Sequence, residues 1–291
     1  MRTISERTIL IERQFSLAQT CGPAAWVGAR SPRQAWINGA FLHVEWEGEH
    51  IVWRRVSQPA ADALTIVGTA SPDEDVAWMR RVLGSEVVMP VFTEPAIALL
   101  ADRYPGMRPL NDGSLFNGLL SSIVGQSISV AAAAVTQAKL AAAFTAPIEL
   151  EGRAFWPLPR ADQLAEASVA LIRTSGVTWK RAEAVQAVAR AELAGELPSD
   201  DDALREPDVV AKALVALPGV GRWTAESALL WGVGAVDAHP SGDVALLRAT
   251  RLAYDDPALT LRDLDALAER WSPARALAAR LLWTDLFGIA S

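Results

Sequence analysis

Residues 217–243 read LPGVGRWTAESALLWGVGAVDAHPSGD, and this stretch decides the expected fold. The helical pattern DVVAKALVA precedes it, and the apolar-periodic ESALLWG follows its first two glycines. Proline cannot donate a backbone hydrogen bond inside a helix, so Pro218 marks the end of the first helix. Gly219 and Gly221 allow positive φ and the close approach of another backbone. The pattern therefore predicts two helices joined by a tight hairpin.

This hairpin has the features of an anion-binding turn. Gly221 stands just before a helix N-terminus, where unpaired N–H groups and the helix dipole both favour a phosphate. Thr224 can add a hydroxyl contact, and Arg222 can add a positive charge. The alternative is a plain helix–helix turn, and for an isolated Pro-Gly-x-Gly motif that interpretation is the better one.

An aspartate with two interpretations follows the hairpin along the chain. The segment 237–243, DAHPSGD, precedes a new apolar helix that begins VALLRATRLA. Asp243 suits the N-cap or the first turn of that helix, because the dipole favours an acid there. Seen alone, this aspartate is best explained as a helix cap.

The hairpin and the following Pro-x-x-Asp together resemble the helix-hairpin-helix base-excision DNA glycosylases. SLFNGLLSSIVGQSISVAAAA (114–134) is similar to that family's helix pair joined by a Gly-Gln turn, and GVTWKRAEAVQAVA (176–189) to the helix before its hairpin. WSPARALAARLLW (271–283) resembles the closing helix of bacterial 3-methyladenine DNA glycosylase II, the AlkA type. The similarity covers most of residues 110–287. It outweighs the interpretation of Asp243 as a cap only.

The resemblance implies a mainly α fold in which two helical subdomains flank a cleft, with a small α+β domain at the N-terminus. The residues agree with this division into 1–88 and an all-helical 89–291. Phe41–Val56 reads as a β-hairpin and Ala63–Thr69 as a further strand, followed by a helix capped by Ser71. Beyond Met89, apolar residues recur at helical spacing. The expected helices cover 94–103, 114–124, 129–144, 161–167, 180–193, 208–216, 222–231, 243–252, 261–270 and 273–287, and the acidic run 196–208 is expected to be a solvated loop.

The resemblance implies a monofunctional glycosylase that hydrolyses the N-glycosidic bond of alkylated bases, chiefly 3-methyladenine, in double-stranded DNA and leaves an abasic site. Asp243 would stabilise the oxocarbenium-like sugar cation and orient or deprotonate the attacking water. Trp223 occupies the position where bifunctional members carry a lysine nucleophile, so no lyase activity is expected. The chain has a single cysteine, Cys21, which excludes the four-cysteine iron–sulfur cluster of another branch. No cofactor is required.

The flipped base is expected to be held by aromatic side chains. Trp223 and Trp283 match pocket-lining positions of the family, although both also suit the core of a helical bundle. Ser227 stands where a larger aromatic often closes the pocket, which implies a roomier site. For Trp231 and Trp271 the core interpretation is preferred.

DNA contacts are expected from a local patch of the hairpin and its neighbours. The candidate residues are Gln126, Ser127, Lys180, Arg181, Gly219, Gly221, Arg222 and Thr224. Ser127 is too small to fill the gap that a flipped base leaves, so either Gln126 or another loop fills it, or the filling is weak. The resemblance also implies a structural Na⁺ or K⁺ at the hairpin, because the family hairpin often holds one through backbone carbonyls, for which those of Val215, Leu217 and Val220 are the candidates here.

Composition sets limits on these interpretations. The 291 residues include 27 Lys+Arg and 34 Asp+Glu, a formal net charge of −7, which argues against coating nucleic acid by bulk charge but permits one basic face. Charged residues interrupt the stretch 1–15, so it does not read as a signal peptide, and we expect a cytoplasmic monomer that acts on nucleoid DNA and binds no membrane. The histidines are too few for a catalytic divalent metal; His43 and His50 are expected at the surface, and His239 is expected to shape the loop before Asp243. The alternatives are a glycosylase with another lesion preference and a non-catalytic DNA-binding module.

Overall fold

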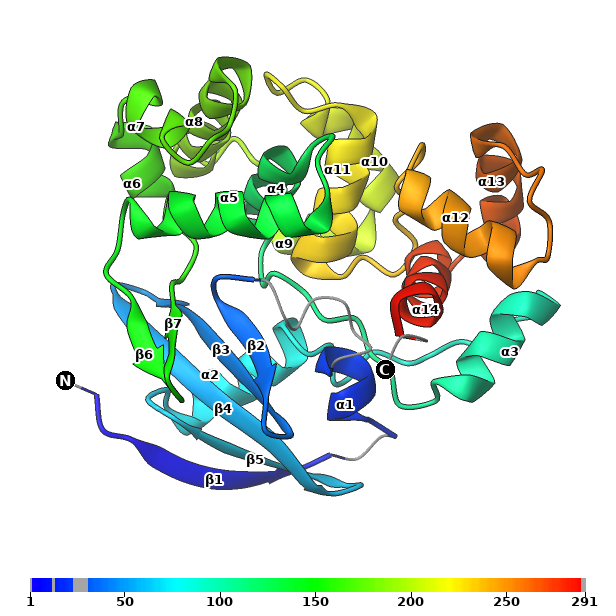
Figure 1. Ribbon diagram of the computed structural model, residues 1–291, viewed down its shortest axis with the longest axis horizontal. Coiled ribbons are helices and arrows are strands. Elements are labelled where there is room, and N and C mark those ends of the chain that lie inside the picture. The colour runs from blue at the N-terminus through cyan, green and yellow to red at the C-terminus, as the bar shows by residue number, and fades with distance from the viewer. Residues whose placement is uncertain (1, 12–13, 23–30, 289–291) are drawn as a thin grey trace.

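The computed structural model describes residues 2–11, 14–22 and 31–288. An antiparallel sheet lies on one side of the molecule, and helices occupy the rest (Figure 1). Of the stretch 1–15 used above, Met1, Glu12 and Arg13 lie outside the described residues. The mainly helical fold with a small N-terminal sheet is confirmed, whereas the boundary at residue 88 stays a prediction.

The sheet has the strand order β1-β5-β4-β3-β2 with antiparallel neighbours. Its strands are β1 (Ser5–Leu10), β2 (Gln34–Ile37), β3 (Ala40–Glu47), β4 (His50–Ala60) and β5 (Ala63–Gly68). The predicted hairpin is confirmed, because β3 pairs with β4 from Phe41 opposite Val56 to Glu47 opposite His50. The predicted strand at 63–69 is β5. The sequence patterns had not indicated β1 and β2.

Helix α2 (Pro72–Arg81) packs on one face of the sheet, and the short helix α1 (Leu17–Cys21) joins the same core. Ser71 caps α2 as predicted: its side chain accepts a hydrogen bond from the Glu74 N–H, and the Glu74 carboxylate accepts one from the Ser71 N–H. This capping box satisfies two of the donors that a helix N-terminus leaves unpaired. Trp78 and Met79 of α2 are buried in this core.

The prediction that His43 lies at the surface is wrong. Its side chain is 0% exposed, and its Nδ1 accepts a hydrogen bond from Trp78 Nε1 at 3.2 Å. Burial, aided by the positive charges of Arg33 and Arg54, holds the pKa of His43 well below its usual range, so the ring is neutral at pH 7. His50, at the hairpin turn, is exposed as predicted.

His43 is buried because it lies on the α2 face of the sheet, where Trp78 covers it, and the other face is covered as well. Residues of β3 alternate between the α2 side and the opposite side, where a second, two-stranded sheet packs. This sheet consists of β6 (Ile148–Leu150) and β7 (Arg153–Phe155). It lies within 89–291, so the prediction that this part is all-helical is wrong. The two strands are too short for a period-2 pattern to stand out in the sequence.

The predicted helices are all present, with ends shifted by a few residues. The helical elements are α3 (Pro95–Arg103), α4 (Leu115–Gly125), α5 (Val130–Ala142), α6 (Ala161–Glu166), α7 (Val169–Arg173), α8 (Trp179–Leu193), α9 (Asp200–Arg205), α10 (Pro207–Leu214), α11 (Arg222–Ala228), the π-helical turn η1 (Leu229–Val233), α12 (Val244–Ala253), α13 (Leu261–Ala268), the 3-10 turn η2 (Glu269–Trp271) and α14 (Arg275–Gly288). The acidic run 196–208 is not only a loop, because Ser199 caps α9 within it.

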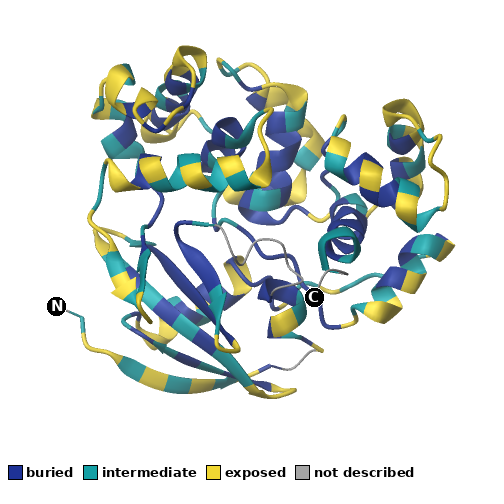
Figure 2. Ribbon diagram, viewed as in Figure 1, coloured by how far each residue is buried: buried dark blue, intermediate teal, exposed yellow. Residues whose placement is uncertain are grey.

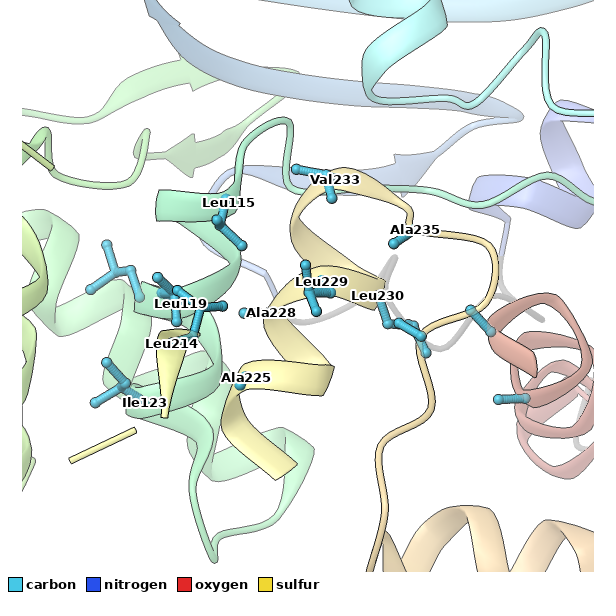
Figure 3. Close-up of a cluster of buried hydrophobic side chains, with 14 of the residues drawn as sticks. Leu115, Leu119, Ile123, Leu214, Ala225, Ala228, Leu229, Leu230, Val233 and Ala235 are labelled. Atoms are coloured by element: carbon cyan, nitrogen blue, oxygen red, sulfur yellow. The ribbon is translucent and has the colours of Figure 1, made fainter. Parts of the chain in front are cut away.

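Helix α4 is the buried centre of the helical part (Figure 2). Its leucines pack against Ala225 and Ala228 of α11 (Figure 3). Glycines allow this close approach: a Cβ added to Gly118 would lie 2.4 Å from the Ala228 carbonyl oxygen, and one added to Gly232 would lie 2.7 Å from that of Ser114. The contact fixes the hairpin helix α11 against the core.

Helices α3, α12, α13 and α14 form a second group, on the right of Figure 1, and a hydrogen bond from Trp223 of α11 to Asp243 links the two groups. Within the described ranges, no single helix is long and apolar enough to cross a membrane. Helices α4 and α5 meet the length and composition criteria only as a joined pair, and they are bent by 117° at their break.

Candidate active site and DNA-contacting groove

The predicted hairpin joins α10 to α11. Gly219 adopts a φ of +77°, and a Cβ there would also lie 2.5 Å from the Cβ of Ala184 on α8. Glycine is therefore required for conformation and for space. Gly221 is the N-cap of α11, and no side chain caps this helix. The turn thus lies directly against α8, with the Gly219 backbone facing the Ala184 methyl group.

A groove of about 580 Å³ opens between the hairpin and the start of α8. Several of the predicted DNA-contacting residues meet there although they are far apart in sequence. The groove is lined by Gln126, Thr178, Lys180, Arg181, Ala184, Val215, Leu217, Gly219, Val220 and Gly221. Two cationic side chains and the glycine backbone of the hairpin therefore face one space.

Gln126 and Thr224 connect the hairpin to the turn between α4 and α5. Gln126 Nε2 donates to the Gly219 carbonyl oxygen at 3.0 Å and to Thr224 Oγ1 at 2.9 Å. Thr224 is 3% exposed. The expected contact of Thr224 with DNA is therefore not what the structure shows, because its hydroxyl is buried and supports the hairpin.

Asp243 stands at the N-terminus of α12, close to the hairpin helix. Its Oδ1 accepts a hydrogen bond from the Leu246 N–H at 2.7 Å, which confirms the predicted N-cap. Its Oδ2 accepts one from Trp223 Nε1 at 3.0 Å. Asp243 and Trp223 are both half-buried, so the carboxylate is neither enclosed in the core nor remote from the hairpin. Capping and a chemical role are compatible in this geometry.

The loop before Asp243 is held from the second helical group. Asp237 accepts hydrogen bonds from the Arg275 backbone N–H at 3.0 Å and from its guanidinium at 3.0 and 3.1 Å. His239 is 5% exposed, and its Nε2 lies 2.9 Å from Asp265 Oδ1. These contacts fit the expectation that His239 shapes the loop.

Comparisons with known proteins agree with this geometry. No family model matches the chain. It is 29% identical to DNA-3-methyladenine glycosylase 2 of Escherichia coli (strain K12) over 210 residues, which cover 72% of this chain and 71% of that protein. It is 24% identical to DNA-3-methyladenine glycosylase of Bacillus subtilis (strain 168) over 195 residues, which cover 67% of this chain and 64% of that protein. Its structure matches the 3-methyladenine DNA glycosylase from Archaeoglobus fulgidus with a TM-score of 0.79 at 20% identity, over 97% of this chain and 98% of that one. The resemblance to AlkA-type helix-hairpin-helix DNA glycosylases is confirmed.

The side chains predicted to line a base pocket are less open than expected. Ser227 is 2% exposed and Trp283 is 3% exposed, so neither offers an open face to a base in this structure. Trp283 stacks on Trp231, with ring centroids 5.3 Å apart. Trp231 is half-buried and Trp271 is buried, which agrees with the prediction that both pack in the core. The expectation of a roomier pocket at Ser227 is therefore not met, because other groups cover this side chain.

Beside these rings, the buried cation Arg280 fixes α14. Arg280 donates to the carbonyl oxygens of Leu110 at 2.8 Å and Leu230 at 2.5 Å, and to Asn111 Oδ1 at 3.0 Å. Its Cζ lies 4.3 Å from the centroid of the Trp231 ring. Burial lowers the pKa of Arg280 to about 9, so the group is still a cation at neutral pH. Arg280 and the two tryptophans thus form one stack.

Two exposed residues near the groove, Trp179 and Ile128, were not predicted from the sequence. Trp179, the first residue of α8, is 52% exposed, and the Arg173 guanidinium lies 4.8 Å from its ring centroid. Ile128 is 37% exposed, and it follows the predicted Ser127, which is exposed with a φ of +53°. The sequence offered two signals for these residues: Trp179 is an aromatic residue beside Lys180, and Ile128 is an isoleucine between two serines.

The described residues contain no group of three or more His, Cys, Asp or Glu side chains that could hold a metal ion. Val215, Leu217 and Val220, the candidate backbone ligands of a monovalent cation, all line the groove. The Leu217 carbonyl accepts a hydrogen bond from the Val220 N–H at 3.1 Å. A carbonyl oxygen has a second lone pair, so cation binding at the hairpin stays a prediction.

Proposed function

We propose that the protein is a monofunctional DNA glycosylase that removes alkylated bases, 3-methyladenine and related lesions, from double-stranded DNA and leaves an abasic site. One observation carries this proposal: the half-buried Asp243 carboxylate, fixed by Trp223 Nε1 at 3.0 Å, beside a hairpin with a basic groove. The relatives are named DNA-3-methyladenine glycosylases, which supports the choice of lesion.

The chemistry requires an anion near the sugar. Alkylation at a ring nitrogen places positive charge on a purine and weakens its glycosidic bond, so little acid catalysis at the base is needed. The oxocarbenium-like transition state is stabilised by a carboxylate that is already oriented. Asp243 meets this need because donors from Leu246 and Trp223 hold its two oxygens, and the N-terminus of α12 favours negative charge there. Its remaining lone pairs can accept a proton from the attacking water.

The base must leave the duplex before it can meet Asp243. Extrusion costs a few kcal/mol, and less for a damaged, poorly stacked base. The ring of Trp223 is half-buried and adjoins the carboxylate, so it can attract a cationic base by about 0.5–2 kcal/mol. Because Ser227 and Trp283 are covered, we propose that base entry moves the groups that cover them.

We propose that strand cleavage does not accompany base release. The indole nitrogen of Trp223 donates to Asp243 and has no basic lone pair with which to attack the sugar. Lys180 and Lys212 are exposed amines, and Lys180 lies at the groove rather than in contact with Asp243. The support for this proposal is chemical, since a Schiff base with the sugar requires an amine at the reacting sugar carbon.

Incubation with methylated duplex DNA tests both proposals. Free bases are separated by chromatography, and strand breaks are scored by gel before and after alkali. We expect release of 3-methyladenine, with breaks only after alkali. Breaks without alkali would contradict the monofunctional assignment. Release from an 8-oxoguanine duplex alone would overturn the lesion choice, and binding without release of any base would indicate a DNA-binding module.

The groove is proposed to hold DNA phosphates through Lys180 and Arg181. Replacing both with alanine is expected to weaken binding and to reduce the slope of log affinity against log salt by about 0.9 for each lost phosphate contact. Fluorescence anisotropy across a salt series measures this slope. Arg190→Ala is the matched control, because Arg190 is exposed near the other end of the same helix. An unchanged slope in the double variant would show that the groove does not face DNA.

A further inference from the structure

We propose that Glu226 is a positioning residue that holds the Pro240–Asp243 loop on the hairpin helix and thereby sets the orientation of the Asp243 carboxylate. The inference rests on the proposed function. It adds a residue that acts on catalysis through the loop, without touching the substrate.

Two contacts place Glu226 between the DNA-binding and the catalytic parts of the site. Its Oε2 accepts a hydrogen bond from the Ser241 backbone N–H at 2.8 Å. Its Oε1 accepts one from Arg222 Nε at 2.8 Å. Glu226 is 9% exposed, so both bonds are largely shielded from solvent. A carboxylate that accepts backbone and guanidinium donors makes stronger bonds than a neutral side chain.

Glu226 and Trp223 form a pair on α11. They are three residues apart, so they lie on the same side of the helix one turn from each other. Trp223 reaches the loop at Asp243 Oδ2 and Glu226 reaches it at the Ser241 N–H. The Leu246 N–H and Trp223 Nε1 hold the two carboxylate oxygens, and the bond from Ser241 to Glu226 adds a second attachment to the same rigid helix, which fixes the backbone of the loop before Asp243.

The loop needs such an attachment because of its own composition. Gly242 adopts a φ of +80° and nothing lies within 4 Å of the place where its Cβ would be. The Ser241 N–H also lies 2.9 Å from the carbonyl oxygen of His239, and the Asp243 N–H donates to the Pro240 carbonyl oxygen at 3.2 Å, so these local turns shape the loop without joining Ser241 to α11. Without Glu226, the peptide between Ser241 and Asp243 can rotate at the glycine. A displacement of about 1 Å at a catalytic group can cost about a hundredfold in rate.

Arg222 allows the two roles of Glu226 to be separated. The Arg222 side chain is 71% exposed, and that of Glu226 is 11% exposed. The ion pair raises the pKa of Arg222 and leaves most of its side chain free to meet a phosphate. Arg222→Gln therefore removes the charge that contacts DNA and keeps the bond from Glu226 to Ser241.

Single-turnover excision of methylated bases, alongside affinity for a duplex with an abasic-site analogue, tests the proposal. Glu226→Ala is expected to slow excision about tenfold to a hundredfold, with affinity within about threefold of wild type. Glu226→Gln keeps an oxygen acceptor for the Ser241 N–H and is expected to restore the rate to within about threefold. Arg222→Gln is expected to weaken binding, and it serves as the comparison for the affinity measurement only. Glu166→Ala, an exposed acid of α6, is the control and is expected to match wild type.

Each other outcome is informative. Wild-type rate in Glu226→Ala overturns the positioning role while leaving the proposed function intact. An excision rate in Glu226→Gln as low as in Glu226→Ala, with both variants folded by circular dichroism, overturns it as well, because the retained acceptor then has no effect. If Glu226→Ala does not fold, the rate of Glu226→Gln decides. Failure of the proposed function is seen separately, as absence of base release by the wild type.

Discussion

Asparagine in place of Asp243 is expected to slow release of 3-methyladenine by about 10²- to 10⁴-fold, the range associated with loss of a proton-transfer group. The substitution keeps the shape of the side chain. Asparagine is as good an N-cap as aspartate, so its Oδ1 can still accept from the Leu246 N–H. What it loses is the negative charge that is proposed to face the sugar and the capacity to take a proton from water.

The second oxygen of Asp243 makes the test sharper. In the asparagine variant, either the amide NH₂ faces Trp223 Nε1, where two donors meet, or the cap is lost. One such mismatch costs about 1–3 kcal/mol, which a stable domain tolerates. Thermal denaturation checks that the variant is folded, and anisotropy checks that it binds DNA. Asp263→Asn is the matched control, because it removes an acid from the first turn of the exposed helix α13. Base release by Asp243→Asn at near wild-type rate would remove the catalytic assignment.

The largest expected effect on stability comes from Arg280→Met. Methionine fills the volume of the aliphatic stem but leaves the acceptors at Leu110, Asn111 and Leu230 without their donor. Each buried acceptor left unpaired costs about 1–3 kcal/mol, so we expect a loss of about 3–5 kcal/mol in the free energy of unfolding. The stacking of the guanidinium on Trp231 is lost as well.

Denaturant titration and calorimetry measure this loss, and the Tm is expected to fall by about 5–15 °C. Arg248→Met is the control: Arg248 is exposed on α12, and exposed substitutions usually change stability by less than about 0.5 kcal/mol. If the two variants unfolded at the same denaturant concentration, the Arg280 contacts would carry no net stability. The Trp231–Trp283 stack would then need another source of rigidity.

Local patterns carried most of the correct predictions. The helices were recognisable from apolar spacing, and Ser71 and Asp243 were recognisable as caps, because these features involve residues a few positions apart. Lys180 and Gly219, both predicted to contact DNA, line one groove, and their contact with DNA stays a prediction.

The failures concern contacts between distant segments. His43 is buried because Trp78 covers it, and Thr224 is occupied because Gln126 reaches it from another helix pair. The burial of Ser227 and Trp283 depends on how α14 packs beside η1. The role of Glu226 was hidden for the same reason, since nothing in a helix sequence shows that one of its acids accepts a bond from a loop fifteen residues later.

The β6–β7 hairpin ties the two parts of the chain together. Phe155 is fully buried with Leu42 and Val44 of the amino-terminal sheet, and Ile148 and Leu150 pack around them. A shortened chain that kept the helices and the β6–β7 hairpin but lacked the amino-terminal sheet would therefore expose this apolar patch to water and tend to self-associate. The amino-terminal sheet covers the apolar face of the β6–β7 hairpin, which belongs to the helical half. A minimal catalytic fragment without this sheet would therefore need polar substitutions on the hairpin to avoid aggregation.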